Sequence, residues 1–280
     1  SASPCQGEGR EFESRHPLKA EGPVHQDRPF VVRLPTPSAY PGDMITDIIG
    51  PLLPPTEPEL RAIFITSLNG SITVDGRSGA LGNDTDRALL LAMRDWSDVV
   101  LAGAHTVTAE NYGGVVTSPE VSAARVAEGR PPVPRLAVVT RSLRLDPESR
   151  FFREATTPPL VLIPGSSFTD PDLAAQRDRL TAAGAEIHST GDGSPAEIVR
   201  VLHGLGLPRI SCEGGPALFS EVLRAGLVDV LHLTVAPVIH APVEKQLAHD
   251  VHTRFTLDRH LATDDGTLFL RLRRPGTGLR

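Results

Sequence analysis

The sequence predicts an α/β protein: a three-layer sandwich on a mixed sheet, with parallel core strands and an antiparallel C-terminal edge. Short, wholly apolar runs bounded by Gly, Pro or polar residues recur along the chain, which is typical of parallel strands covered on both faces. They alternate with stretches of helical periodicity as far as residue 225, which indicates βαβ units. Beyond that point, three strand-like segments follow one another without a long helix between them.

The first core strand is expected at Arg61–Leu68, a β-favouring apolar run that follows the Pro-rich segment 51–58. The first helix is expected at Asp84–Trp96, because apolar residues recur there at helical spacing and Asn83 or Asp84 can cap its start.

The later elements follow from the same patterns. Further strands are expected at 98–102, 135–140, 159–163, 186–189 and 209–212, and further helices at 170–183, 194–205 and 216–225. The last three strands are expected at 229–236, 254–263 and 267–273. Asp265–Gly266 is a favoured two-residue hairpin turn, so the sheet should close with an antiparallel edge.

Composition narrows the classes of function. A net charge of -6 argues against nucleic acid as the main partner, because phosphate backbones are bound by clustered Lys and Arg. No apolar run approaches the roughly 18 residues of a membrane span. The two cysteines, Cys5 and Cys212, provide neither a disulfide framework nor a Cys-based metal site, so we expect no metal and a cytoplasmic location.

Residues 1–43 are expected to form a tail outside a single domain of residues 44–280, since they carry charge and Pro but no periodic apolar face. Two interpretations of this tail stay open. It is a genuine disordered arm, or it is non-native: the string Gly9–Pro17 resembles a tRNA T-loop read through as codons, which would place the true start at Met44.

The strongest local signal for chemistry is Glu213-Gly214-Gly215-Pro216, directly after a strand and directly before a helix. The glycines allow a ligand to approach the backbone, and Pro suits the first helical position. The exposed amides of this turn and the helix dipole favour an anion such as a pyrophosphate. The amides concerned are those of Gly215, Ala217 and Leu218. The alternative is a tight strand-to-helix turn without a ligand.

Two other strand ends carry polar groups. Gly103 is followed by His105, which can donate to phosphate oxygens, and by Thr106, which can cap a helix. Alternatively, His105 is a solvated loop residue. Thr140-Arg141-Ser142 places a guanidinium between two hydroxyls, a plausible seat for the 2′-phosphate of NADP unless Arg141 is simply a surface residue. All three sites follow the C-terminal ends of strands predicted to be parallel, where open α/β sheets bind ligands.

These motifs resemble, in order and spacing, the reductase domain of the bifunctional riboflavin-biosynthesis deaminase-reductase, and in particular its stand-alone pyrimidine reductase-like subgroup. The resemblance covers about Arg61–Arg273 and rests on Ser67–Gly70, Gly103–Val107, Thr140–Ser142, Glu213–Pro216, Gly226–Asp229 and Ala236–Pro237. It implies a dihydrofolate-reductase-like fold.

The resemblance further implies that NADPH is the cofactor, with its nicotinamide near Thr66 and with substrate beside Ser67, Asn69 and Glu110. The residues expected to hold NADPH are Thr66, Gly103, His105, Thr106, Thr140, Arg141, Ser142, Gly214, Gly215, Pro216, Ala217 and Leu218. By analogy with the family we also expect a homodimer.

Two departures from the family concern the substrate. The family's Ser-Leu-Asp-Gly-Lys is here Ser67-Leu68-Asn69-Gly70-Ser71, which lacks the lysine beside the substrate. The segment 110–115 lacks the arginine that would grip a substrate phosphate. These losses predict weak activity on a phosphorylated pyrimidine and better activity on unphosphorylated or pterin-like rings. A basic residue from elsewhere could compensate, the candidates being Arg77, Arg87 and Arg94.

The leading hypothesis is therefore a reductase that moves a hydride from NADPH to a polarised C=N or C=O carbon of a small heterocyclic substrate. Glu213, at the phosphate turn, and Asp86, near the start of the first helix, are the candidate catalytic acids, although each could be a solvated carboxylate beside a helix. Two alternatives are an NADP-binding protein without turnover and a dihydrofolate-reductase-like enzyme. The sequence does not identify the physiological substrate.

Overall fold

The computed structural model describes residues 41–54 and 56–277. Residues 1–40 of the predicted tail lie outside the described residues, so the interpretations of the tail stay predictions. The first described element is helix α1, Pro41–Ile49, which the sequence patterns did not predict and which starts inside the predicted tail. Its Ile48 is buried, and Met44 and Ile45 pack against the same core cluster. Residues 41–49 therefore belong to the folded unit.

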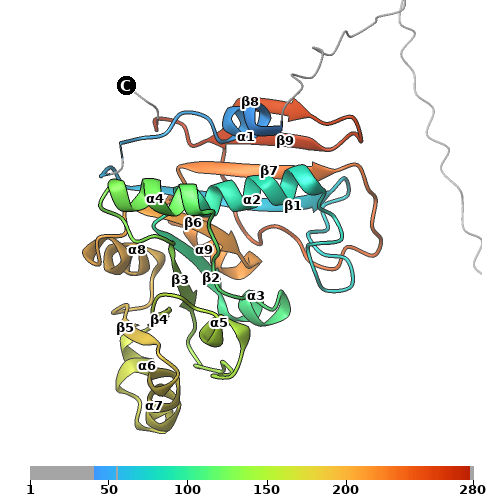
Figure 1. The fold of residues 1–280 in the computed structure, drawn as a ribbon. Coiled ribbons are helices and arrows are strands. Elements are labelled where there is room, and N and C mark those ends of the chain that lie inside the picture. Colours follow the sequence, from blue (N-terminus) through green and yellow to red (C-terminus); the bar gives the residue numbers. More distant parts are fainter. Residues whose placement is uncertain (1–40, 55, 278–280) are drawn as a thin grey trace, which may run out of the picture. The chain divides into compact units, whose positions relative to one another are not determined.

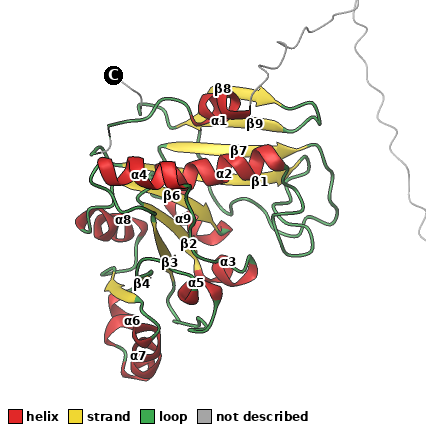
Figure 2. Cartoon of the chain, in the orientation of Figure 1, coloured by secondary structure: helices red, strands yellow, loops and turns green. Residues whose placement is uncertain are grey.

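A nine-stranded sheet crosses the described part of the chain in the order β5-β4-β3-β2-β6-β1-β7-β9-β8 (Figure 1). Its strands are β1 Glu59–Ser67, β2 Val99–Gly103, β3 Arg135–Val139, β4 Leu160–Ile163, β5 Glu186–Ser189, β6 Arg209–Gly214, β7 Val230–Ala236, β8 Thr256–Ala262 and β9 Leu268–Arg273. The helices after α1 are α2 Asp84–Trp96, α3 Ala104–Ala109, α4 Pro119–Ala127, α5 Arg150–Arg153, α6 Gly165–Thr169, α7 Ala174–Ala182, α8 Pro195–Gly204 and α9 Pro216–Arg224, with a 3-10 turn at Pro171–Leu173 (Figure 2).

The predicted fold class is confirmed. Strands β1 to β7 pair in parallel, whereas β9 pairs antiparallel with β7 and β8 pairs antiparallel with β9. One detail of the prediction was wrong. Thr263 N donates to Thr267 O, so the hairpin closes through the three residues 264–266 that lie between this backbone pair, and Gly266 N donates to Thr263 O. Gly266 has φ +84°, so the loop is a turn closed by a left-handed glycine.

Helices cover both faces of the sheet, which makes the sandwich three-layered. On one face, α8 and α9 bury Leu202 and Phe219 against the strands in the largest core cluster. On the other face, α1 and α2 bury Ile48 and Met93 in a cluster with strands β1 and β9. That second face continues to β2, β3 and β4, where α5 contributes Phe151 to a further cluster. Strand β6, between β2 and β1, is thus covered on both faces.

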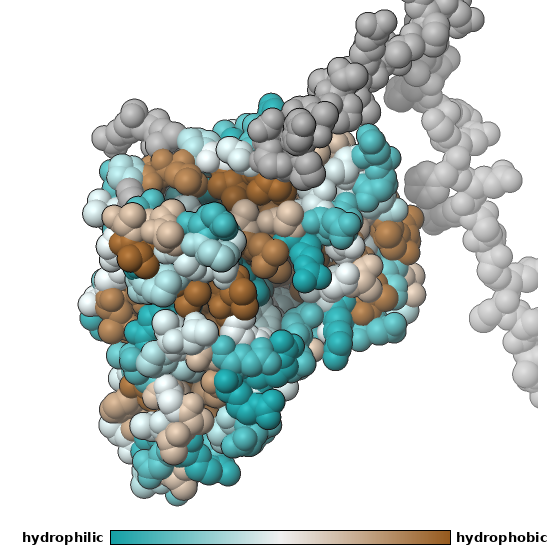
Figure 3. Space-filling view, viewed as in Figure 1, coloured by the Kyte–Doolittle hydropathy of each residue, from teal (hydrophilic) through white to brown (hydrophobic). Residues whose placement is uncertain are grey.

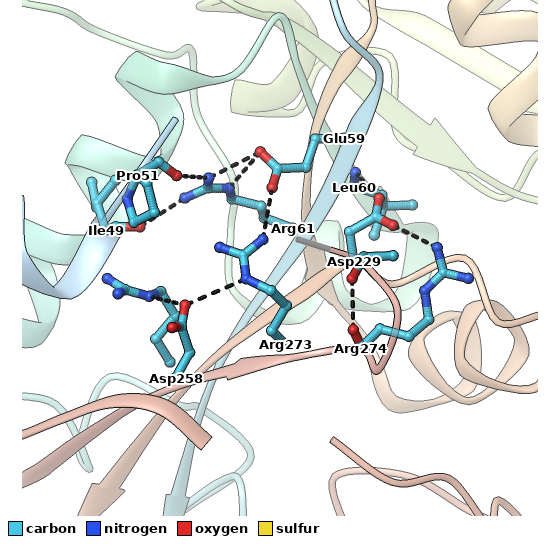
Figure 4. A network of polar contacts seen from close by, with 11 residues as sticks. Ile49, Pro51, Glu59, Leu60, Arg61, Asp229, Asp258, Arg273 and Arg274 are labelled. Carbon is cyan, nitrogen blue, oxygen red and sulfur yellow. Dashed lines mark hydrogen bonds and ion pairs between the residues drawn. The ribbon is translucent and has the colours of Figure 1, made fainter. Parts of the chain in front are cut away.

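A buried arginine fastens α1 to the sheet at the end remote from the C-termini of the parallel strands (Figure 4). Arg61, fully buried on β1, donates from Nε to Glu59 Oε2 at 2.9 Å. Its Nη1 and Nη2 donate to the carbonyl oxygens of Ile49, at 2.8 Å, and Pro51, at 2.9 Å. The guanidinium thus satisfies carbonyl groups at the end of α1 that the helix itself cannot pair.

The neighbouring strands extend this network. Arg271 on β9 donates to the carbonyl oxygens of Asp47 and Ile48 and from Nε to Asp258 Oδ2, at 2.6, 3.0 and 2.8 Å. Beside it, Arg273 lies 3.7 Å from Glu59 Oε1 (Figure 4). Charged side chains at this end of the sheet are therefore matched by charges or by helix carbonyls, which is the condition for burying them.

On the side shown in Figure 3, apolar side chains form several patches separated by polar ones. Leu91 of α2 and Val126 of α4 are among the exposed apolar residues of the described chain. Within residues 41–54 and 56–277, the helices are all too short or too polar to cross a membrane.

Replacing Arg61 with Met should lower the free energy of unfolding by about 3–5 kcal/mol, because Glu59 and two buried carbonyl groups lose their donor. Urea unfolding measures this. Arg200→Ala is the matched control: Arg200 pairs with Glu197 but is 66% exposed, so its loss should change stability by less than about 0.5 kcal/mol. Equal effects of the two substitutions would contradict the role given to Arg61.

Candidate functional site

A cavity of about 140 Å³ opens at the C-terminal ends of β1, β2 and β6, beside α2 and α3. This is where open α/β sheets bind ligands. Its wall is mostly apolar and carries a few polar side chains. The lining residues are Ile63, Phe64, Ile65, Ile72, Thr73, Gly76, Ser78, Asp86, Leu90, His105, Thr106, Ala109, Glu110, Tyr112, Glu213, Gly215, Pro216 and Lys245.

The β6–α9 turn forms one end of this cavity. Gly214 has φ +106°, a conformation that favours glycine. A Cβ on Gly215 would lie 2.3 Å from Thr106 Oγ1, so a side chain at this position fits only if the Thr106 side chain shifts. Gly215 is the N-cap of α9 but has no side chain to cap it, and Pro216 follows at the first helical position. The turn therefore leaves the amide end of a nine-residue helix beside the cavity, as an anion site requires.

Glu213 is held between two elements. Its buried carboxylate accepts from Arg94 Nε, at 2.8 Å to Oε1, and from Arg94 Nη2, at 2.7 Å to Oε2. The hydroxyl of Tyr112 donates to Oε2 at 2.8 Å, and the Arg94 guanidinium lies 5.4 Å from the centre of the Tyr112 ring. Burial alone would lower the pKa of Arg94, but the carboxylate raises it. Burial, helped by Glu213, raises the pKa of Tyr112.

These contacts fix the orientation of Glu213 and so support an anchoring role for it. The Glu213 carboxylate already accepts two hydrogen bonds from Arg94 and one from Tyr112, and these bonds favour its charged form. Its role as the catalytic acid, which would need a proton on this carboxylate, stays a prediction.

Asp86, the other predicted acid, lines the cavity from the first turn of α2. Its backbone N–H donates to the Asn83 side chain, which caps the helix as predicted. Burial raises the pKa of Asp86, and the neighbouring Thr234 hydroxyl offsets part of that rise. A partly buried carboxyl group of raised pKa at the wall of a cavity can hold a proton at a pH where an ordinary aspartate cannot, so it suits hydrogen bonding or proton donation to a ligand.

Strand β2 and helix α3 place three of the predicted residues, Gly103, His105 and Thr106, near the β6–α9 turn. His105 and Thr106 line the cavity, and a Cβ on Gly103 would lie 3.7 Å from Gly215 N, so the β2–α3 and β6–α9 turns pack closely. Glu110, predicted to contact substrate, also lines the cavity and accepts from Ser78 N at 2.9 Å through Oε1.

The predicted 2′-phosphate seat lies outside this cavity. Thr140 is buried, and its Oγ1 accepts from Leu143 N at 3.1 Å, so its side chain shapes the turn after β3. Arg141 is 74% exposed and lies 3.7 Å from Glu221 of α9. Ser142 lines a second, larger cavity of about 1000 Å³ together with residues of α3, α5 and α7. Of the three predicted residues, Arg141 is therefore the one that could meet an anion beside α9, because its guanidinium is exposed and lies close to that helix.

The side chains predicted to lie around the nicotinamide and substrate make hydrogen bonds to neighbouring loop residues. Ser67 donates to Asn69 Oδ1 at 2.8 Å and accepts from Ser71 N at 2.8 Å. Asn69 pairs with the backbone of His240, accepting at 3.0 Å and donating at 2.7 Å. Thr66 Oγ1 donates to Ser67 O at 3.1 Å. None of Thr66, Ser67 and Asn69 lines the cavity described above, and their contacts with ligands stay predictions.

Sequence reasoning missed four features of this site. Arg94 was considered only as a spare cation, Tyr112 and Thr73 were not considered, and Lys245 lies in the long β7–β8 loop, where no periodicity marks it. Arg94 and Glu213 are 119 positions apart, so only the fold brings them together. The one available signal for Lys245 is its rarity, because the sequence contains two lysines, Lys19 and Lys245.

Comparison with known proteins identifies the family. The model of the RibD C-terminal domain matches residues 58–269, which span the sheet from the start of β1 into β9 and include every residue lining the cavity. The chain belongs to the RibD C-terminal domain family. This confirms the predicted family resemblance and the predicted class of enzyme, an oxidoreductase.

Relatives within this family are named as reductases. The chain is 26% identical over 178 residues to the 2,5-diamino-6-ribosylamino-4(3H)-pyrimidinone 5′-phosphate reductase of Methanothermobacter thermautotrophicus, covering 61% of this chain and 77% of that protein. A solved pyrimidine reductase-like protein from Corynebacterium diphtheriae is 36% identical, with a TM-score of 0.71 over 78% of this chain and 92% of that one. The RibD of Acinetobacter baumannii, 20% identical over 78% of this chain and 58% of that one with a TM-score of 0.62, shares the fold.

The turn between β6 and α9, whose residues Gly215 and Pro216 we call the cradle, gives a direct test. Replacing Gly215 with Ala places a methyl group against Thr106 and into the path of any anion at α9, so NADPH affinity should fall by at least tenfold. Isothermal titration calorimetry measures this. Gly204→Ala at the end of α8 is the control, because a Cβ there has no atom within 4 Å, and it should leave affinity unchanged. Undiminished binding by the Gly215 variant would place the phosphates elsewhere.

Proposed function

We propose that the protein is an NADPH-dependent reductase of a pyrimidine that carries a phosphoribosylamino substituent, the reaction class named for its relatives. The observation that carries this proposal is a cavity with an anion cradle at one end, Gly215 and Pro216, and the partly buried acid Asp86 on its wall. A reductase of a polar heterocycle needs both features close together, because binding must align two reactants before hydride transfer.

The residues present fit NADPH. The amide end of α9 and the close glycine turns would hold the pyrophosphate, with His105 and Thr106 beside it. Arg141, exposed and close to α9, would meet the 2′-phosphate. When bound, NADPH supplies the hydride.

The chain itself supplies alignment, exclusion of water and a proton. Ile63, Ile65 and Leu90 present apolar surface to the cavity and would exclude water from the reacting atoms. Protonated Asp86 offers one O–H donor and one carbonyl acceptor, the pair of groups that an amide or amidine edge of a pyrimidine ring can meet. The Arg94, Glu213 and Tyr112 contacts would keep the cradle in place while substrate enters and leaves.

Three finer expectations stand as part of the proposal. We infer a homodimer, as expected from the family, which analytical ultracentrifugation would test.

We infer a cytoplasmic location, which suits Cys212: this thiol is free and buried, and burial raises its pKa to about 12. We place the catalytic domain in residues 44–280, with α1 extending that domain to Pro41.

Steady-state oxidation of NADPH, followed at 340 nm, tests the proposed reaction. The phosphorylated ribosylamino-pyrimidine should be reduced with kcat/KM above about 10⁴ M⁻¹s⁻¹, and dihydrofolate far more slowly. Because Asp86 must be protonated and burial raises its pKa, activity should fall as pH rises through that pKa. Asp86→Asn should lower kcat by about 10²-fold and remove this limb of the pH profile.

Binding of NADPH without oxidation in the presence of any of these rings would favour a protein that binds the cofactor without turnover. Faster reduction of dihydrofolate than of the pyrimidine would favour a dihydrofolate-reductase-like enzyme. A pH profile of the Asp86→Asn variant identical to that of the wild type would remove the proton-donor role from Asp86.

Cofactor preference tests Arg141 separately. NADPH should bind more tightly than NADH by about 1.5–3 kcal/mol, because a guanidinium makes charge-assisted bonds to the 2′-phosphate. Arg141→Ala should remove this difference and leave NADH affinity unchanged. Arg144→Ala, which removes another exposed arginine from the same loop, is the control. Equal affinities of the wild type for both cofactors would contradict the assignment.

A further inference from the structure

We propose that Lys245 binds the phosphate of the substrate and makes the site select phosphorylated over unphosphorylated pyrimidines. This inference rests on the proposed function. It reverses the preference predicted from the sequence, which followed from two missing cations and did not consider the β7–β8 loop.

Lys245 lies in the wall of the cavity together with Ile72 and Thr73. Its side chain is partly buried, and its backbone oxygen accepts from Ile72 N at 3.0 Å. The β7–β8 loop is thereby paired with the segment that follows β1. The lysine thus belongs to the wall of the cavity that Asp86 also lines.

Glu244, the neighbouring residue, holds this part of the loop in place. Its Oε1 accepts from Asp75 N at 2.7 Å, and its Oε2 accepts from Gly76 N at 3.0 Å and from Thr73 Oγ1 at 2.8 Å. His240 lies 3.1 Å from Oε1. Donation by the Gly76 amide and the Thr73 hydroxyl lowers the pKa of Glu244 to about 2. The carboxylate closest in sequence to Lys245 is therefore engaged with the opposite loop.

The other carboxylates of the cavity are occupied in the same way or favour their protonated form. Glu213 pairs with Arg94, Glu110 accepts from Ser78 N, and burial raises the pKa of Asp86. Within residues 41–54 and 56–277, no ion pair involves Lys245. A partly buried lysine that lines a cavity and has no matching anion among these residues is a site for an anionic part of a ligand.

The other basic residues near this end of the sheet do not fill that role. The Arg94 guanidinium is engaged by Glu213, and Arg77 and Arg87 are exposed and do not line the cavity. His105 lines it from α3, beside the cradle assigned to the cofactor. A lysine suits a substrate that must enter and leave, because its charge sits on a flexible stem and binds phosphate as a point charge.

Asp86 and Lys245 together indicate the substrate's chemistry: a ring edge that both donates and accepts hydrogen bonds, with an anionic arm attached. A phosphate and a carboxylate would both satisfy the ammonium group. We assign phosphate, because the named relatives act on a 5′-phosphate, and the experiment separates the two by including dihydrofolate, whose arm carries carboxylates.

The test compares Lys245→Met with Arg77→Met, which removes an exposed positive charge from the adjacent loop. For Lys245→Met, kcat/KM for the phosphorylated pyrimidine should fall about 10- to 100-fold, mainly through KM, and that for the dephosphorylated pyrimidine should change less than twofold. NADPH affinity should not change. Lys245→Arg should recover part of the loss, and Arg77→Met should resemble the wild type.

A wild type that prefers the dephosphorylated ring, a Lys245→Met variant with an unchanged ratio between the two pyrimidines, or a selective loss of dihydrofolate activity would overturn the inference. A binding measurement tests the role of Lys245 even if the protein turns over neither pyrimidine: ribose 5-phosphate is titrated into the protein in the presence of NADP⁺. Calorimetry should show that Lys245→Met weakens this binding about 10-fold or more. If the wild type reduces neither pyrimidine but shows this difference, the proposed function fails and the phosphate site stands; if binding is also equal, both fail.

Discussion

The buried carboxylate of Glu213 sits at the end of β6, a strand covered by helices on both faces, and receives two hydrogen bonds from Arg94 and one from Tyr112. These contacts tie the end of a central strand to α2 and to the segment after α3. The Gly214–Gly215 turn follows at once, so these contacts help to fix its position. Breaking a buried pair leaves an uncompensated charge, which is why the turn has little freedom to move.

The positions of the other cavity residues depend on this turn and on helix α2. Gly215 approaches the β2–α3 turn so closely that a side chain would meet Thr106, which keeps the amide end of α9 open. The same helix α2 that supplies Arg94 also carries Asp86, two helical turns earlier, so the acid and the cradle are positioned by one rigid element. Lys245 then completes the wall from the β7–β8 loop.

Local patterns were enough to predict most of the fold. The bounds of α2 were correct at both ends, because Asn83 caps the helix and apolar residues recur at helical spacing. Helix α1 was missed because its apolar face is short and lies beside a segment without periodicity, and α4 was missed because it lies in a loop rich in polar residues and proline. The Gly-Gly-Pro turn was found from local chemistry, whereas the Arg94–Glu213 pair and Lys245 depend on contacts between distant segments that periodicity does not reveal.

The central claim of this account is that cradle and acid share one cavity, so that cofactor and pyrimidine react directly within it. Transfer of deuterium from NADPH labelled at C4 tests this most directly, with the product analysed by mass spectrometry. One of the two C4-deuterated stereoisomers should deliver its deuterium to the reduced pyrimidine, raising the product mass by about one unit per turnover. Reduction of the pyrimidine without deuterium from either stereoisomer would contradict the account.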